Sequence, residues 1–196
     1  MRAWLFGACA LALSGAFMVD VACPDLYENE AEASVSINLT LDELVASSQT
    51  VAVVEPLERS SRWEKVGDSK RIVTYTKVVV HDLVTGEKRD EVWVRTLGGK
   101  VGKVGQHVSG EATFTLGERS LVFLSKAGEA TVVTGMAQGH YPLEEKDGVV
   151  RLKSSPDTGK LVDKRGPRES AREKLIGKKL TDATESIRNA AKALKK

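Results

Sequence analysis

Short segments in which hydrophobic and polar residues alternate make up most of this chain. The longest, RIVTYTKVVVHDLV at 71–84, is rich in Val, Ile, Thr and Tyr, which are residue types that favour strands. DEVWVRTL at 90–97 alternates strictly, with Val92 and Val94 facing one way. Turn signals recur about every 8–15 residues, a spacing typical of antiparallel barrels and sandwiches. The pattern therefore predicts a mainly β fold, built as an antiparallel barrel or sandwich.

Further strand candidates end at turn residues or share the same enrichment. They are residues 49–60, 112–125 (two strands around 116–118), 129–135, 139–145 and 149–155. Proline cannot donate a hydrogen bond to a neighbouring strand, so we expect the first candidate to break near Pro56. Residues 61–70 are expected to form a charged loop or a hairpin tip. Asp147-Gly148 suits a tight hairpin turn.

Helical patterns flank this β region. Thr40 and Glu43 form a capping box and predict a short N-terminal helix over 41–47. Residues 168–177 have a helical pattern that ends at Gly177. In residues 181–196 the small and apolar residues form one stripe, with acids in the first turn and lysines in the last, an arrangement that complements the helix dipole. We therefore expect C-terminal helices.

The first residues have the pattern of a secretory signal peptide. Arg2 gives a positive start, and residues 3–19 carry no charge, but this run is a little shorter than the roughly 20 apolar residues of a spanning helix. We therefore expect an exported protein that is periplasmic, outer-membrane-associated or secreted. The expected divisions are a signal peptide (1–22), a flexible tether (23–34), a β domain (35–165) and a C-terminal helical segment (166–196).

The sequence contains two candidate sites for cleavage of the signal peptide. VDVAC, which ends at Cys23, resembles the lipidation motif of bacterial lipoproteins, although Asp20 stands where that motif usually has an apolar residue. Cleavage after Ala16 is the alternative. Cys9 lies within the signal, so at most one cysteine remains and no internal disulfide can form. Cys23 is then a lipidated membrane contact, half of an intermolecular bridge or a free thiol, or it is removed or inert in a flexible tail.

Composition and charge narrow the class of partner. The hydrophobic content of 41% and charged content of 29% are ordinary for a globular domain, and the net charge is +2. From residue 160 onward, however, twelve Lys or Arg stand against five acids. Such a basic end either contacts anionic lipid, polysaccharide or nucleic acid, or forms a solvated helix face. We expect an envelope or extracellular protein or a glycan as partner, and no nucleic acid.

Six glycines fall within residues 98–118, which raises the question of a nucleotide-binding loop. A P-loop requires Gly-Lys followed by Ser or Thr and then by a helix. Here Val104 follows Gly102-Lys103, and strand-like residues come next. The dinucleotide fingerprint is also absent. These glycines instead predict an irregular hairpin or bulged β segment, and no cofactor is expected.

Candidate catalytic residues are few. There is no Gly-x-Ser-x-Gly elbow, and the histidines lack the spacing of a zinc-binding helix, so no metal site is expected. We favour a non-catalytic binding or structural module. The alternative is a hydrolase whose site assembles from His107, Glu111 and His140. In GMAQGHY, the side chains of Gln138, His140 and Tyr141 form either a binding lip or a tight connection.

Four segments in this order resemble a family of uncharacterised exported bacterial proteins common in myxobacteria, over about 41–152. They are LDELVASSQTVAVVEPLERSSRWE, RIVTYTKVVVHDLVTGE, VRTLGGKVGKVGQHVSGEATFTLGERSLVFL and GMAQGHYPL. The resemblance implies an envelope or secreted protein without an assigned activity. The strand order is also similar to the OB-like barrel of netrin and metalloprotease-inhibitor modules. Those modules rely on N-terminal cysteines that this chain lacks, so inhibitor function is not implied.

Overall fold

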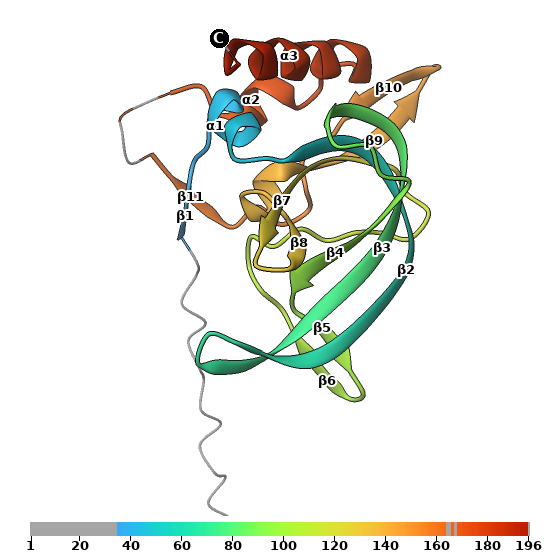
Figure 1. Cartoon of the computed structure of the whole chain (residues 1–196), viewed down its shortest axis with the longest axis vertical. Helices are drawn as coiled ribbons and strands as arrows, with labels where there is room; N and C mark the ends of the chain where they lie inside the picture. The colour runs from blue at the N-terminus through green and yellow to red at the C-terminus, as the bar shows by residue number, and fades with distance from the viewer. Residues whose placement is uncertain (1–34, 164–165, 167, 196) are drawn as a thin grey trace, which may run out of the picture. The chain divides into compact units, whose positions relative to one another are not determined.

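Five strands of the chain close into a ring (Figure 1). A computed structural model describes residues 35–163, 166 and 168–195, and the predicted signal peptide, tether and Cys23 lie outside them. In ring order the strands are β2 (Thr50–Val66), β3 (Ser69–Gly86), β4 (Glu91–Leu97), β8 (Ala130–Val133) and β7 (Ser120–Ala127), and β7 pairs again with β2. All of these pairs are antiparallel except β4–β8, which is parallel.

This strand order is that of an OB-like barrel, in which the third and fifth strands run parallel. With 49% strand and 18% helix, the predicted mainly β fold class is confirmed. The other strands lie outside the five-stranded ring. They are β9 (His140–Lys146) beside β7 and β10 (Val149–Leu152) beside β9, the hairpin of β5 (Gly99–Val101) and β6 (Val104–Gln106), and the parallel pair of β1 (Val35–Ile37) and β11 (Lys160–Val162).

Three α-helices gather at one end of the domain in Figure 1: α1 (Leu41–Ala46), α2 (Ala171–Leu175) and α3 (Leu180–Ala193). The capping box of α1 is present, because the Thr40 hydroxyl accepts from the Glu43 N–H while the Glu43 carboxylate accepts from the Thr40 N–H. A short 3-10 helix, η1 (Met136–Gly139), precedes β9. Among the described residues, no helix has both the length and the apolar character to cross a bilayer.

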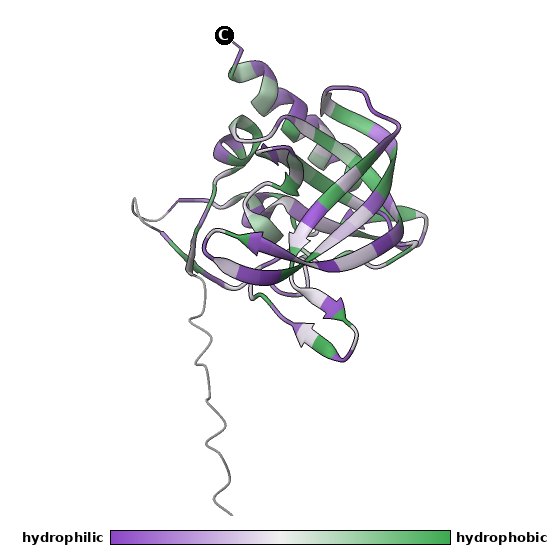
Figure 2. Ribbon diagram, turned by 60° about the horizontal axis from the view of Figure 1, so that its bottom comes forward, coloured by the Kyte–Doolittle hydropathy of each residue, from purple (hydrophilic) through white to green (hydrophobic). Residues whose placement is uncertain are grey.

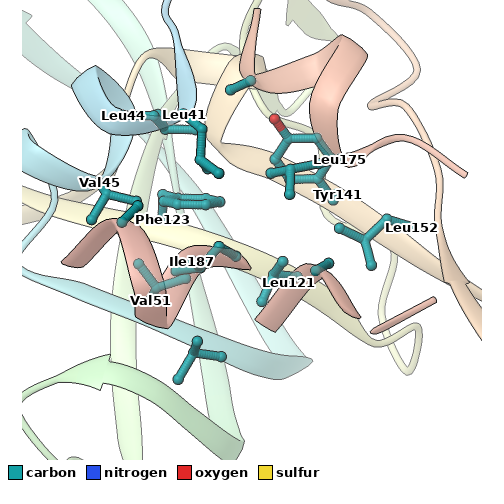
Figure 3. Packing of buried hydrophobic residues seen from close by; sticks show 14 of the residues in the cluster. Leu41, Leu44, Val45, Val51, Leu121, Phe123, Tyr141, Leu152, Leu175 and Ile187 are labelled. Atoms are coloured by element: carbon teal, nitrogen blue, oxygen red, sulfur yellow. The ribbon is translucent and has the colours of Figure 1, made fainter. Parts of the chain in front are cut away.

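Two hydrophobic cores lie on opposite sides of the β2–β7 wall. One fills the barrel and consists of Ala52, Val54, Val78, Val92, Val94, Ala112, Phe114, Val122, Leu124 and Val133. The other lies between the barrel wall and the helices, as Figure 3 shows, and includes Leu41, Leu44, Val45, Leu121, Phe123, Tyr141, Leu175 and Ile187. The C-terminal helices thus share a core with the β domain.

The two cores explain the unbroken hydrophobic runs of β2 and β7. Successive side chains of a strand point to opposite faces, so Val51 and Val53 meet the helices while Ala52 and Val54 enter the barrel. The same division applies to β7. In most other strands one face is exposed, and hydrophobic and hydrophilic residues alternate along them (Figure 2).

Two of the strand predictions are wrong. The strand β2 does not break near Pro56, which pairs with Val78, and it continues to Val66, so only Gly67 and Asp68 remain as the hairpin tip. A shift in register directly after Pro56 leaves Leu57 out of the pairing and accommodates the proline. Residues 112–115 are not a strand, although Ala112 and Phe114 reach the barrel core. The glycine-rich stretch does form a hairpin, β5–β6, as predicted.

Replacing Phe123 with Ala should lower the free energy of unfolding by about 3–5 kcal/mol, because the lost ring leaves a cavity between the helices and the barrel wall. Urea unfolding followed by circular dichroism measures this change. The matched control is Leu116→Ala: Leu116 is 45% exposed, and its truncation should cost no more than about 0.5 kcal/mol. Equal losses in the two variants would contradict the packing described here.

Candidate functional site

The interior of the barrel changes from apolar to polar toward one end. Along β3 the inward residues run Val78, Thr76, Thr74, and along β4 the paired positions run Val92, Val94, Thr96. Threonine has nearly the shape of valine but carries a hydroxyl. These hydroxyls line a cleft at the open end of the barrel, which we call the mouth cleft. It is lined by Arg59, Thr74, Thr76, Thr96, Thr113 and Phe114, together with residues 97–99 and Ala112.

Part of this hydroxyl set is held by local hydrogen bonds. The Thr74 hydroxyl donates to the Gly98 carbonyl at 2.7 Å and lies 2.8 Å from the Ser61 hydroxyl. The hydroxyls of Thr76 and Thr113 make no hydrogen bond to any other described residue. Gly99 (φ +128°) presses against the Ser61 and Thr74 hydroxyls, where a Cβ would collide. The wall of the cleft therefore requires glycine at 99. Of the two hydroxyls without a partner, that of Thr113 is exposed, whereas Thr76 is 2% exposed and lies within the wall.

Arg59 reaches the cleft because of the bulge after Pro56. Residues directly opposite each other on paired strands point to the same face. Since Leu57 is left out of the pairing, Arg59 lies opposite Thr76 and Ser61 lies opposite Thr74. The order in which β2 side chains point to the two faces is thereby shifted by one residue. As a result, the Arg59 side chain points to the face of the ribbon that continues the barrel interior.

The opposite face of the β2–β3 ribbon carries paired charges. Glu64 accepts hydrogen bonds from Arg62 (2.7 Å), from the Tyr75 hydroxyl (3.0 Å) and from Arg95 (3.3 Å). The hydrogen bond from Arg62 is the largest cause that lowers the pKa of Glu64. The Arg62 guanidinium also stacks 4.4 Å above the Tyr75 ring. On this face Arg62 and Arg95 therefore share one anion, Glu64, whereas Arg71, which lies opposite Glu64 in the ladder, has no ion pair among the described residues.

A second groove contains two of the predicted catalytic residues. His107 is exposed and its Nε2 lies 3.0 Å from Asp157 Oδ2. Glu111 lines the same groove, but its oxygens accept from the backbone N–H groups of Leu97 and Ala112, both at 3.1 Å. Burial raises the pKa of the Glu111 carboxyl, although these two donors oppose the shift. Glu111 thus joins the end of β4 to the following loop.

His140 does not line that groove. It is 1% exposed, and its ring nitrogens lie 3.0 Å from the Ser155 hydroxyl and 3.1 Å from the Ser120 hydroxyl. The Phe114 ring meets it edge-on, with 4.9 Å between centroids. Burial lowers the pKa of His140 to about 4, so the imidazole is neutral at physiological pH. The structure therefore does not bring His107, Glu111 and His140 into one site, and the hydrolase alternative gains no support.

The binding-lip interpretation of Gln138, His140 and Tyr141 is also wrong, because all three side chains are buried. Gln138 donates to the Ile37 carbonyl (3.0 Å) and accepts from the Leu39 N–H (2.9 Å), so its amide fastens the chain on either side of Asn38. Tyr141 belongs to the helix-side core, and burial raises the pKa of its hydroxyl. The segment is a tight connection.

Sequence reasoning missed Ser120 and Ser155 as partners of His140, and Arg59 and the threonines as lining of the mouth cleft. The change from Val to Thr along 92–96 and 74–78 was visible in the sequence. Which face Arg59 occupies was not, since it depends on the bulge. No protein-family model, curated protein or solved structure matches this chain, so the site must be interpreted from its own chemistry.

The buried His140 should make stability depend on pH. In the unfolded chain the imidazole takes up a proton below its ordinary pKa of 6.5, whereas in the folded protein it stays neutral down to about 4. The stabilisation is therefore complete above pH 6.5 and is lost as the pH falls toward 4, a change of about 3 kcal/mol. The quantity to compare is the difference in the free energy of unfolding between the wild type and His140→Gln. We expect this difference to fall by about 3 kcal/mol between pH 6.5 and pH 4.

Urea unfolding at a series of pH values measures this difference, and subtraction of the variant removes the contribution of the carboxylates. The His140 ring resonances of the folded protein give an independent titration midpoint. Parallel stability curves for the two proteins would show that the histidine is not held neutral by burial.

Proposed function

We propose that the protein is an exported, non-catalytic binding module of the bacterial cell envelope, and that it binds an anionic ligand in the mouth cleft. The observation that carries this proposal is Arg59, a cation without an ion pair among the described residues, at the rim of a cleft lined by threonine hydroxyls. A guanidinium is a strong donor to carboxylate, phosphate and sulfate groups. Hydroxyls both donate and accept hydrogen bonds, which suits a hydroxylated or hydrated ligand.

The chemistry of the lining supports binding without turnover. General acid–base catalysis needs a group that exchanges a proton near the working pH, usually His, Glu, Asp, Lys, Tyr or Cys. The side chains that line the mouth cleft are threonines, Arg59, Leu97, Ala112 and Phe114, and none of these titrates near neutral pH. The cleft can therefore hold and orient a ligand, but it has no proton to exchange.

The envelope location rests on the N-terminal residues and on the charge of the C-terminal end. The uncharged run after Arg2 is typical of an export signal. Helix α3 turns Ala183, Ile187 and Ala190 to the core and exposes Arg188 and Lys192, and Lys195, just after the helix, is exposed as well. These cations, together with a lipidated Cys23, would give peripheral contact with an anionic membrane surface.

Arg59→Ala should weaken binding of a polyanion about tenfold, because the variant loses a charge-assisted hydrogen bond. We would measure the affinities of the immobilised protein for polygalacturonate, dextran sulfate and polyphosphate at low salt, with neutral dextran as the uncharged control. Arg62→Ala is the matched control, since Arg62 lies on the opposite face of the same strand and is paired with Glu64. It should change the affinity less than about twofold.

Three outcomes of this measurement would contradict the proposal. The first is that the immobilised protein retains no polyanion, and the second is that both variants lose affinity equally. The third is that a bound polymer is shortened during incubation. The last outcome would mean catalysis rather than binding. Thermal unfolding of each variant shows whether it is folded.

The export part of the proposal predicts a mature protein that lacks its first residues. The intact mass of protein isolated from its own cells, measured without reducing agent, should correspond either to a chain that starts at Cys23 and carries acyl groups or to an unmodified chain that starts near Phe17. The first result makes the protein a lipoprotein and the second a free exported protein. A mass that includes Arg2 would contradict cleavage of a signal peptide.

A further inference from the structure

Two β-hairpins end in narrow tips at the same end of the domain, away from the helices (Figure 1). The turn at Gly67-Asp68 joins β2 to β3, and the turn at Gly102-Lys103 joins β5 to β6. Each turn starts at a glycine with positive φ, +60° and +61°, which permits a two-residue connection. The β5–β6 hairpin projects from the barrel in Figure 2, and a Cβ on Gly102 or Gly105 would meet no atom within 4 Å beyond its chain neighbours. We call residues 63–71 and 100–105 together the hairpin end.

The two hairpins are fastened to each other near their bases. Gly99, at the start of β5, lies against the Ser61 and Thr74 hydroxyls of the β2–β3 ribbon. The Gln106 side chain, at the end of β6, accepts a hydrogen bond of 2.7 Å from the Ile72 N–H. The β5–β6 hairpin thus covers the middle of the ribbon. The parts of both hairpins that can meet a partner are therefore their tips, which these contacts hold in a defined arrangement.

The hairpin end is strongly cationic. Five of its exposed side chains have no ion pair with any other described residue, namely Lys65, Lys70, Arg71, Lys100 and Lys103. Of its two acids, Asp68 lies in the first turn, and Glu64 already pairs with two arginines. Lys65 lies directly opposite Lys70 in the ladder, and like charges at opposed positions destabilise an antiparallel pair. An anionic partner would replace this repulsion with attraction.

Each hairpin also exposes an apolar side chain among these cations. Trp63 on the first hairpin is 40% exposed, and Val104 on the second is 51% exposed. The Lys70 ammonium lies 5.8 Å from the centroid of the Trp63 ring, and Val104 directly follows Lys103. Tryptophan and lysine both suit a boundary between water and an apolar phase, because each has an apolar body and a polar tip. The hairpin end therefore combines positive charge with exposed apolar surface in both hairpins.

The placement of these groups favours a flat partner over one that lies in a groove. Trp63, Lys65 and Lys70 lie on one face of the ribbon. Arg71 lies on the other face, and the remaining two lysines belong to the second hairpin. A ligand bound along one face would therefore reach only some of the cations. A lipid bilayer can meet the whole end at once, because its anionic headgroups extend over a surface and its apolar layer accepts side chains such as Trp63 and Val104.

We propose that the hairpin end binds the surface of an anionic lipid bilayer. The five cations attract the headgroups, and each cation near such a surface strengthens binding about fivefold. Trp63 and Val104 enter the boundary between the headgroups and the acyl chains. This surface is separate from the mouth cleft, because Arg59 and the cleft threonines lie outside the hairpin end, and from the cations of α3 at the other end of the domain (Figure 1). The inference thus adds a contact that the proposed function does not include.

Co-sedimentation with lipid vesicles tests this inference. The protein is made as residues 24–196, which contain every residue of both cores and lack the predicted signal and Cys23, so neither a signal nor an acyl chain binds the bilayer. We expect it to sediment with phosphatidylcholine vesicles that contain about one-third phosphatidylglycerol, but not with pure phosphatidylcholine. Binding should fall steeply from low to moderate salt. The tryptophan emission should shift to shorter wavelength on binding, and this shift should persist in Trp93→Phe but disappear in Trp63→Phe.

Exposed lysines provide a matched pair of variants. Lys100→Ala combined with Lys103→Ala should weaken vesicle binding at least tenfold. Lys88→Ala combined with Lys146→Ala removes the same charge from the β3–β4 and β9–β10 turns, which lie near α3 in Figure 1. This control should change binding less than about twofold, since charges farther than about 10 Å from the bilayer are screened. Val104→Thr keeps the shape of the side chain but not its apolar character, and it should weaken binding about threefold. Thermal unfolding midpoints show that each variant is folded.

The outcomes separate this inference from the proposed function. Loss of vesicle binding in Arg188→Ala combined with Lys192→Ala, but not in the β5–β6 variant, would make α3 the contact and overturn the hairpin end. Equal losses in the β5–β6 variant and its control would also overturn it. An unchanged Trp63 emission together with no effect of Val104→Thr would mean that the hairpin end attracts anions without entering a bilayer. None of these results affects the mouth cleft, which is tested by Arg59→Ala with soluble polyanions.

Discussion

Burial of β2 and β7 on both faces is the constraint on which the domain depends. Because a strand alternates its side chains, a strand between two cores needs apolar residues at every position. Residues 51–54 and 121–124 meet this requirement, and each core takes alternate members of both runs. Without α1, α2 and α3, Val51, Val53, Leu121 and Phe123 would be exposed to water. The helices therefore complete the barrel wall and do not form a separate unit.

The same wall determines where the domain can be open to a ligand. One side of the barrel is covered by helices, and the interior between the five strands is filled with valine, leucine and phenylalanine. Polar groups occur where this packing ends, at Thr74, Thr76 and Thr96, and at the hydrogen-bonded pair of His140 and Ser120 beside Phe114. Substituting a hydroxyl for a methyl group keeps the volume of valine, so the strands keep their pairing. The mouth cleft thus changes the chemistry of the barrel end without a change in its architecture.

Features that depend on local sequence were predictable, and features that depend on distant partners were not. The Thr40–Glu43 capping box and the β5–β6 hairpin follow from residues a few positions apart. The burial of Gln138 and His140 depends on partners elsewhere in the chain, namely the Ile37 carbonyl, Ser120 and Ser155. The sequence alone therefore suggests that these polar side chains are exposed at the surface. The parallel pairing of β1 with β11 joins residues 35–37 to 160–162, and no local pattern indicates it.

Leu57 has an importance that its own contacts do not suggest. As the unpaired residue of the bulge, it determines which half of the following six residues faces the barrel mouth. Pairing of Leu57 with Lys77 in place of Glu58 would exchange the two surfaces of the ribbon, because a one-residue slip moves every side chain to the other face. Arg59, Ser61 and Trp63 would then turn outward, and Glu58, Ser60 and Arg62 would take their places. Deletion of Leu57 would instead leave Glu58 opposite Lys77 and Arg59 opposite Thr76, so a descendant of this protein could lose the bulge and still keep Arg59 at the barrel mouth.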